Sequence, residues 1–404
     1  MGIAWHRGQE RSWYGAWRGF ALLERSFVSD LAHLVNQLVA IDSVNPDLVP
    51  GGNGERELAE FVAGWLERAG LRVELQEAAP GRPNVIGIVP GAGGGRSLML
   101  NAHLDTVGYD GMESPLAARI EGNRIYGRGA FDMKGSLAAV MLAAAELAQD
   151  PPAGDVIVTA VVDEEFASVG TQAVLADYRA DAAIVTEPTG MRVCIAHKGF
   201  VWLDIETHGV AAHGSRPDLG VDAIAKMGHV LVGIEQLDRA LRANPLHPLL
   251  GSGSIHASLI AGGNGLSTYP EHCRLSIERR TIPGETTAIV VGQLRGILEG
   301  LAAHDPSLKA TLRRGLTRKP FEVSPDEPIV RAVRAAARQA LGEEPALVGE
   351  PFWMDSALLA EAGIPTVIFG PGGEGAHAAV EWVNLDDLEA CRQVYLTAAR
   401  DFCR

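Results

Sequence analysis

The 404-residue sequence is poor in cysteine and in positive charge, and none of its apolar runs is long enough to span a membrane. Its four cysteines, Cys194, Cys273, Cys391 and Cys403, are scattered without a CxxC pair, which argues against a disulfide framework and a thiolate zinc site. We therefore expect reduced thiols and a cytoplasmic protein. Lysine and arginine number 35 against 50 acidic residues, a formal net charge of −15. This balance argues against a nucleic-acid partner or an anionic membrane surface.

Two nucleotide-binding patterns are also incomplete. Residues 90–96 are rich in glycine but lack the GxxxxGK[ST] pattern of a phosphate loop, so we predict a hairpin turn there. Gly127 and Gly129 begin a dinucleotide-type fingerprint, but Asp132 stands where its third glycine should be. Asp132 directly precedes a helix expected over residues 133–149, and by itself it is typical of a helix-capping carboxylate.

Strand-like apolar runs alternate with helix-period segments over much of the chain. This alternation predicts an α/β fold, with a mostly parallel sheet and helices on both faces. From about Lys198 the pattern changes to alternating strands and two long amphipathic helices, at 217–243 and 286–304, in the order βαββαβ. That order predicts an inserted ferredoxin-like α+β domain.

The predicted domain boundaries follow from this change of pattern. We expect a catalytic domain formed by residues 26–197 and 316–404, because helix and strand elements resume after the insertion. Residues 198–315 form the inserted domain. Residues 1–25, which are rich in tryptophan and arginine, form an N-terminal extension of unknown role.

Histidines and acids follow the ends of four apolar runs, at residues 98–100, 156–162, 182–186 and 366–369. Ligands bind beyond the carboxyl ends of parallel strands, so we expect these side chains to meet at one edge of one sheet. They are His103, Asp105, Glu164, Glu165, Glu187 and His377. The sequence therefore predicts a single polar site.

Two histidines and at least three carboxylates, without cysteine, form a ligand set suited to Zn²⁺, Co²⁺ or Mn²⁺. Their number fits two metal ions that share a carboxylate and hold hydroxide between them. A further carboxylate must stay free to accept a proton, and the adjacent Glu164 and Glu165 offer one ligand and one base. Asp105, two residues after His103 in extended chain, points the same way and can orient its ring. The pattern predicts a metal-dependent hydrolase.

Six motifs along the chain resemble a known family. They are HLDTV, GRGAFDMKG, VVDEEF, VTEPTG, GVAAHGSRPDLGVDAI and GEGAHAAVEWV. In this order they resemble the di-zinc metallopeptidases that include acetylornithine deacetylase, succinyl-diaminopimelate desuccinylase, aminoacylase and the glutamate carboxypeptidases. The resemblance runs from about Asp30 to the C-terminus and leaves out the first 25 or so residues.

The resemblance implies a metal-binding role for five residues. His103 and Glu187 resemble ligands of one metal ion, and Glu165 and His377 resemble ligands of the other. Asp132 resembles the carboxylate that bridges the two ions. The ions implied are two divalent cations, with Zn²⁺ expected and Co²⁺ or Mn²⁺ as alternatives.

The resemblance also implies catalytic and substrate-binding roles. Glu164 resembles the general base, and Asp105 the carboxylate that orients a histidine ligand. His213 resembles a histidine that stabilises the oxyanion, in several dimeric members within the partner subunit's site. Arg280 resembles the arginine that clamps the substrate carboxylate. Ser267 stands where many members carry a substrate-polarising asparagine, and there the chain departs from the family.

The activity implied is hydrolysis of the amide bond of an N-acyl-amino acid that carries a free carboxylate. Carboxypeptidase, dipeptidase and N-carbamoyl amino acid amidohydrolase activities remain open on the same scaffold. A catalytically silent binding protein is a more distant alternative, because every expected ligand and base position is filled. The resemblance further implies a homodimer, with the inserted domain acting as a lid and dimerisation domain.

Overall fold

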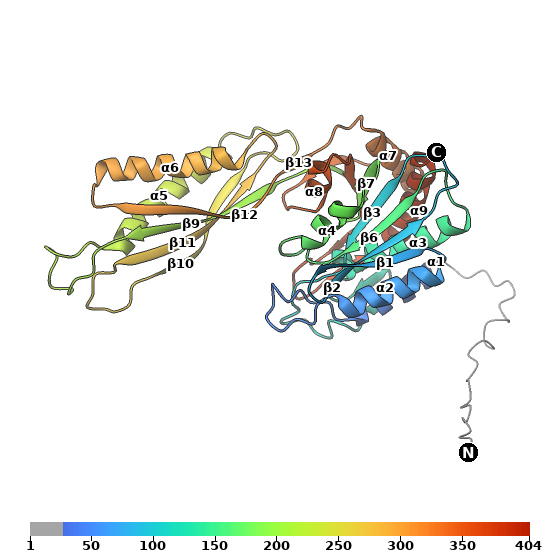
Figure 1. The fold of residues 1–404 in the computed structure, drawn as a ribbon, viewed down its shortest axis with the longest axis horizontal. Helices are drawn as coiled ribbons and strands as arrows, with labels where there is room; N and C mark the ends of the chain where they lie inside the picture. Colours follow the sequence, from blue (N-terminus) through green and yellow to red (C-terminus); the bar gives the residue numbers. More distant parts are fainter. Residues whose placement is uncertain (1–26) are drawn as a thin grey trace, which may run out of the picture.

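The computed structural model describes residues 27–404, and the predicted extension at residues 1–25 lies outside the described residues. The described chain forms two lobes (Figure 1). The larger lobe is built on a nine-stranded sheet, and the smaller, elongated lobe is built on a four-stranded sheet. Within residues 27–404, none of the helices combines the length and apolar character needed to cross a membrane.

The nine-stranded sheet has a parallel centre and largely antiparallel flanks. The parallel centre consists of β6 (Val156–Val161), β3 (Leu98–His103), β7 (Ala182–Val185) and β15 (Thr366–Ile368). One flank is the hairpin of β1 (Arg72–Ala79) and β2 (Arg82–Val89). The other flank consists of β8 (Val193–His197), the antiparallel β13 (Phe321–Glu322), and β14 (Leu347–Glu350), which is parallel to β8. The predicted α/β class is confirmed, and the sheet is mixed.

The glycine-rich residues 90–96 join β2 to β3. The predicted hairpin turn is wrong, because β6 lies between these two strands and pairs with both. A Cβ atom added at Gly95 would lie 2.2 Å from the carbonyl oxygen of Cys403. Glycine at that position therefore permits close approach of the C-terminal segment.

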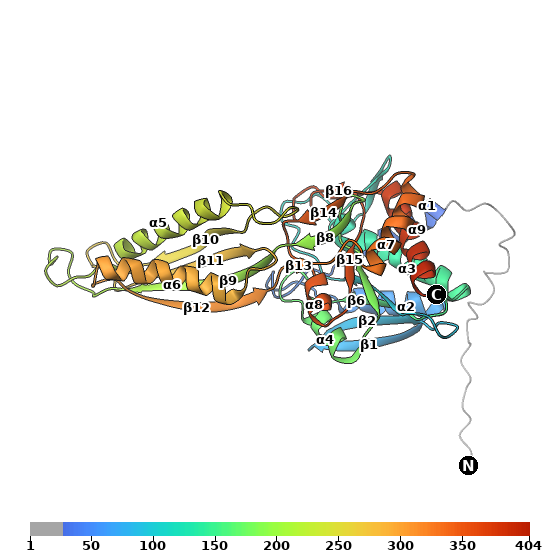
Figure 2. The same cartoon turned by 90° about the horizontal axis from the view of Figure 1, so that it is seen from above.

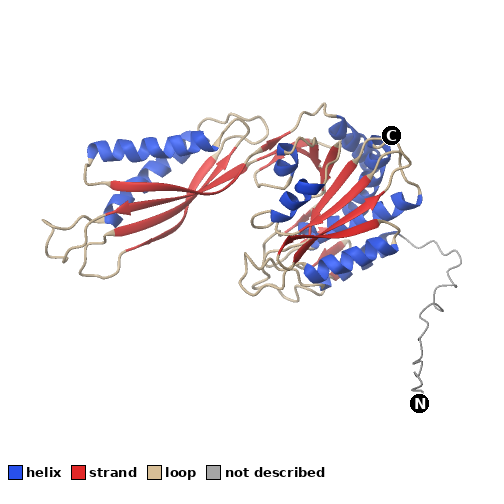
Figure 3. Ribbon diagram, in the orientation of Figure 1, coloured by secondary structure: helices blue, strands red, loops and turns tan. Residues whose placement is uncertain are grey.

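Helices cover both faces of this sheet (Figure 3). One face packs against α1 (Phe27–Ala40), α2 (Arg56–Arg68), α3 (Gly135–Gln149), α7 (Pro328–Leu341) and α9 (Leu385–Phe402). The other face packs against α4 (Val169–Asp177) and α8 (Ser356–Glu361). Successive strand residues point to opposite faces, so Leu98 and Leu100 enter the first core while Met99 enters the second. Each such fully buried side chain contributes about 1.5–3 kcal/mol to folding.

A third, small sheet joins two distant parts of the chain. It consists of β4 (Arg119–Glu121), β5 (Arg124–Tyr126), β17 (Trp382–Asn384) and β16 (Gly373–Glu374). In its register, Trp382 lies opposite Tyr126. The segment that leads to Asp132 therefore lies beside the segment that follows His377.

The smaller lobe has the element order βαββαβ. Its antiparallel sheet contains β10 (Ser254–Gly262), β11 (His272–Thr281), β9 (Gly199–His208) and β12 (Lys309–Arg318), in that spatial order. The helices α5 (Ala223–Arg242) and α6 (Thr287–His304) pack on one face of the sheet (Figure 2). The predicted start of a helix at residue 217 is wrong, because Asp222 is the N-cap and accepts a hydrogen bond from the Ala225 N–H at 2.9 Å.

Candidate metal centre and active site

Five of the predicted site residues line one cavity of about 460 Å³ at the carboxyl ends of the parallel strands. They are Asp132, Glu164, Glu165, Glu187 and His377. His103 lies at the end of β3, 1% exposed, with its ring against the same group. The structure therefore brings together, at one edge of the sheet, all five predicted metal ligands and the predicted base.

Asp132 lies between the two histidines. Its Oδ1 is 3.1 Å from Nε2 of His103, and its Oδ2 is 3.4 Å from Nε2 of His377. Asp132 belongs to a short turn, η1 (Ala130–Lys134), and α3 begins only at Gly135. The interpretation of Asp132 as a helix cap is therefore wrong, and each of its oxygens faces one histidine.

The remaining carboxylates divide between the two histidines. Glu165 Oε2 lies 3.0 Å from Nε2 of His377, and Glu187 Oε1 lies 3.6 Å from Nε2 of His103. Hydrogen bonds to Asp132 and Glu165 raise the pKa of His377 to about 10. Two pairs, each of one histidine and one carboxylate, thus flank the carboxylate of Asp132.

The donor atoms of this cluster fit divalent cations. The ligand atoms of His103, Asp132 and Glu165 lie within 4.8 Å of one another, as do those of His103, Glu164 and Glu187. Burial and the negative charges of Glu187 and Asp355 raise the pKa of Glu164 well above its ordinary value. Buried carboxylates crowded in this way are unfavourable unless positive charge compensates them. Imidazole nitrogens and carboxylate oxygens are the donors that Zn²⁺, Co²⁺ and Mn²⁺ accept.

Asp105 lies beneath the cluster and is fully buried. Its Oδ1 accepts the N–H of Glu164 at 3.1 Å, and its Oδ2 accepts the N–H of Glu165 at 3.1 Å. Nδ1 of His103 lies 2.9 Å from the backbone carbonyl oxygen of Asp105, and 3.6 Å from the carboxylate. The main-chain oxygen of Asp105 therefore orients the ring, whereas its carboxylate fixes the turn that carries the two glutamates.

Sequence reasoning missed Asn45 and Arg82, which support the turn that carries Glu164 and Glu165. Nδ2 of Asn45 donates to Asp105 at 2.8 Å and to Asp163 at 3.0 Å. Asp163 directly precedes Glu164 and has a left-handed φ of 67°. Arg82, from β2, lies 3.1 Å from the same oxygen of Asp163. No local pattern could reveal these contacts, because the partners are distant in the sequence.

The outer part of the cavity combines aromatic side chains with one ion pair. Phe131, Phe352 and Trp353 line it, and Phe352 is 41% exposed. Arg192 lies 3.0 Å from Glu350 at the same wall. Aromatic rings therefore form much of the wall outside the metal-binding cluster.

His213 and Ser267, two of the other predicted site residues, do not line this cavity. They are neighbours in the smaller lobe, where the carbonyl of Ser267 accepts the N–H of Gly214 at 2.7 Å. Strand β9 leaves the larger lobe at Gly199 and continues for ten residues, about 30 Å, before the loop that carries His213. These two residues therefore lie at the far end of the smaller lobe.

Arg280 lies at the opposite end of the smaller lobe, near the junction with the larger one. It pairs with Ser254 and Phe200 in the sheet, at the start of β10 and β9. Its guanidinium is paired with Glu278 and lies 5.5 Å from the ring centre of Phe200. Arg280 does not line the cavity of the metal-binding cluster.

A cluster of histidines and carboxylates at the carboxyl ends of parallel strands is typical of a metal-dependent hydrolase. The chain belongs to peptidase family M20/M25/M40, whose family model matches residues 99–401. The family inferred from the six motifs is therefore confirmed. The protein is an enzyme that hydrolyses amide or peptide bonds.

Individual relatives agree with this assignment. The chain is 31% identical over 385 residues to acetylornithine deacetylase of Myxococcus xanthus, covering 91% of this chain and 96% of that one. It is 28% identical over 410 residues to N-formyl-4-amino-5-aminomethyl-2-methylpyrimidine deformylase of Bacillus subtilis, covering 93% and 95%. The fold matches a dinuclear metal-binding M20 peptidase of Bacillus subtilis with a TM-score of 0.71, at 18% identity and with 93% and 98% of the two chains covered.

Proposed function

We propose that the protein is a deacylase that hydrolyses the amide bond of N-acyl-amino acids. It would use two divalent metal ions, with Zn²⁺ as the preferred metal. The observation that carries the proposal is Asp132, with one carboxylate oxygen facing each histidine. We assign the ions to two groups that share Asp132. His103 and Glu187 complete one group, and His377 and Glu165 complete the other.

The protein's own residues supply the proton transfer. When bound, the two cations would lower the pKa of a water molecule and polarise the substrate carbonyl. Glu164 accepts a proton from the attacking water and returns it to the leaving nitrogen. Three observations support this role. Glu164 lies in the cavity, and its neighbour Glu165 is the residue that pairs with His377. Asp105 accepts hydrogen bonds from the N–H groups of both glutamates and so fixes their position. Arg280 is assigned to the substrate carboxylate. Ser267, which lies beside His213 at the far end of the smaller lobe, is assigned to a further substrate contact in the partner subunit's site.

The substrate is tested by the release of free amine from a panel of compounds. The panel contains N-acetyl-, N-succinyl-, N-formyl- and N-carbamoyl-amino acids and dipeptides, each with Zn²⁺ or Co²⁺ and again after chelation. We expect turnover on N-acyl-amino acids that falls at least 100-fold on chelation, since the cations stabilise the transition state by several kcal/mol, and that returns with added metal.

Other outcomes of the panel support the alternatives. Turnover confined to dipeptides would support a dipeptidase, and turnover confined to N-carbamoyl substrates would support a carbamoylase. Silence of a metal-loaded protein on the whole panel would favour a binding protein. The deacylase is preferred because the relatives with 28–31% identity above are named deacetylase and deformylase.

We further propose a homodimer joined through the smaller lobe, in which His213 stabilises the oxyanion in the partner subunit's site. Two features support it. His213 lies about 30 Å from the junction along β9, too far for its own site. Strand β10 is a sheet edge with unpaired backbone groups, and Leu259 and Ile260 on it are 71% and 56% exposed.

Heterodimers of two inactive variants test this arrangement. Glu164→Gln and His213→Ala chains with different affinity tags are co-expressed, and the doubly tagged dimer is purified. If His213 acts in the partner's site, one of the two sites keeps both residues, so we expect about half of wild-type activity. If His213 acts in its own chain, neither site is intact. Activity no higher than that of the parent homodimers would therefore contradict the proposal.

The location proposed is the cytoplasm. The four cysteines are all buried, and none of them is joined in a disulfide. Free thiols are characteristic of reducing compartments.

A further inference from the structure

Glu381 is a buried carboxylate four residues after His377, and it contacts the turn that carries Asp132. Its Oε1 accepts the N–H groups of Phe131 at 2.9 Å and of Asp132 at 3.1 Å. Its Oε2 accepts the N–H of Gly129 at 3.1 Å and Nη1 of Arg128 at 2.6 Å. The side chain is fully buried, so these four donors replace water around the charge.

The η1 turn has little internal support for the position of Asp132. Asp132 has φ −121° and ψ 92°, outside the helical region, and Gly129 has a left-handed φ of 77°. As a result, the N–H groups of Gly129, Phe131 and Asp132 point toward one place instead of bonding within a helix. Such an arrangement is a nest for an anion, and the carboxylate of Glu381 occupies it.

Glu381 also ties this turn to the segment of His377. The N–H of Gly127 donates to the carbonyl oxygen of Glu381 at 3.2 Å, at the point where β5 and β17 pair. Nη2 of Arg128 donates to the carbonyl of Ala378 at 2.9 Å, one residue after His377. Glu381 and its ion-pair partner Arg128 therefore link the Asp132 turn to the loop that presents the second histidine.

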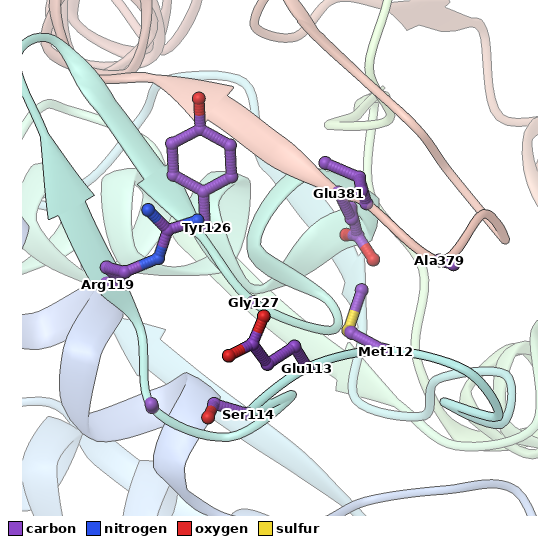
Figure 4. A pocket seen from close by; sticks show the side chains of 10 residues that line it. Met112, Glu113, Ser114, Arg119, Tyr126, Gly127, Ala379 and Glu381 are labelled. Carbon is purple, nitrogen blue, oxygen red and sulfur yellow. The ribbon is translucent and has the colours of Figure 1, made fainter.

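Glu381 acts from outside the active-site cavity. It lines a separate cavity of about 640 Å³. Figure 4 shows Glu381 there with Met112 and Ala379. The residues that line this cavity do not line the cavity of the metal-binding cluster. Glu381 therefore does not contact a substrate bound at the cluster, and its effect must pass through the η1 turn.

We propose that Glu381 is a positioning residue that holds Asp132 between His103 and His377, and thereby sets the affinity of the site for both metal ions. This inference rests on the proposed function, because it takes Asp132 as the ligand shared by the two ions. The variant Glu381→Gln keeps the size of the side chain. It replaces one acceptor oxygen with an NH₂ group, which then faces N–H donors.

Zinc binding by the metal-free protein tests the proposal without any activity assay. Apo protein competes with a chromophoric chelator for Zn²⁺, and the stoichiometry and affinity of wild type are compared with those of E381Q. Loss of a partner that orients a metal ligand weakens binding by about 10- to 100-fold, and we expect this loss for both ions. The control is Val383→Ala, which removes methyl groups from a fully buried residue of β17 two positions away. We expect this control to lower the Tm and to leave zinc affinity unchanged.

Two results would overturn the inference while leaving the proposed function standing. One is a wild-type zinc affinity in E381Q, and the other is an equal loss of affinity in V383A, which would reduce Glu381 to a general structural role. A wild-type protein that binds no zinc would instead contradict the proposed function, and this inference with it. Should E381Q not fold, Glu381→Asp carries the same test, because it withdraws the carboxylate by one methylene. Zinc affinity equal to wild type in E381D would likewise overturn the proposal.

Discussion

Replacing Glu164 with glutamine is expected to lower kcat by about 10²- to 10⁴-fold, the usual contribution of a general acid–base group. Glutamine keeps the shape of the side chain but cannot accept the proton of the attacking water. Among the three glutamates of the metal-binding cluster, Glu164 makes no direct ion pair with either histidine, whereas Glu165 and Glu187 each make one. We therefore expect E164Q to retain two zinc ions per chain, measured by mass spectrometry of the metal after dialysis.

The neighbouring acid provides the matched comparison. Glu165→Gln is expected to weaken zinc binding, because Glu165 lies 3.0 Å from Nε2 of His377. Glu374→Gln, at an exposed position of β16, should change neither metal content nor turnover. The atoms of Glu164 also lie within 4.8 Å of those of His103 and Glu187, close enough to share a cation. Loss of zinc from E164Q would therefore identify Glu164 as a ligand and contradict its assignment as the base.

The sequence predicts the site well where a ligand directly follows a buried strand. His103 and Glu187 come at the carboxyl ends of β3 and β7, and the strand order of the sheet brings those ends side by side. Apolar runs in the sequence identify the strands. Because ligands bind beyond the carboxyl ends of parallel strands, residues at those ends are expected to lie at one edge of the sheet. These positions could be found without a structure, because each depends on local pattern and on one general property of the fold.

Asp132 shows where local pattern stops being informative. An acid before an Ala/Leu-rich helix predicts a cap, and only the resemblance to a family assigned it a bridging role. The difference arises in the η1 turn, whose N–H groups are held by Glu381, 249 residues further along the chain. The position of Asp132 thus depends on the pairing of β5 with β17, which short-range periodicity does not report.

The errors in the fold have a related cause. A glycine-rich segment after a strand is typical of a hairpin, but residues 90–96 cross over β6 because a later strand inserts between β2 and β3. Asn45 was missed for the same reason, since its contacts with Asp105 and Asp163 join residues 60 and 118 positions apart. Strand order and long-range hydrogen bonds are properties of the assembled sheet.

Substitution of Asp132 is expected to lower zinc affinity and turnover strongly. It tests whether the two metal ions share the carboxylate of Asp132. Asp132→Ala removes the oxygens that face His103 and His377, at 3.1 Å and 3.4 Å, so we expect affinity for both zinc ions to fall together. Turnover should fall by at least 10³-fold, because the cations contribute several kcal/mol to the transition state.

Glu187→Gln is the informative comparison, because Glu187 approaches only His103. If Asp132 is shared, E187Q should lower the affinity for one zinc ion, whereas D132A should lower the affinity for both. Competition titrations of the two metal-free variants measure these affinities directly. Asp386→Asn, an exposed position at the start of α9, serves as the charge-matched control and should bind two ions normally. Selective loss of a single ion from D132A would assign Asp132 to one metal. The approach of its second oxygen to the other histidine would then reflect only hydrogen bonding, and two sites without a shared ligand would replace the shared centre.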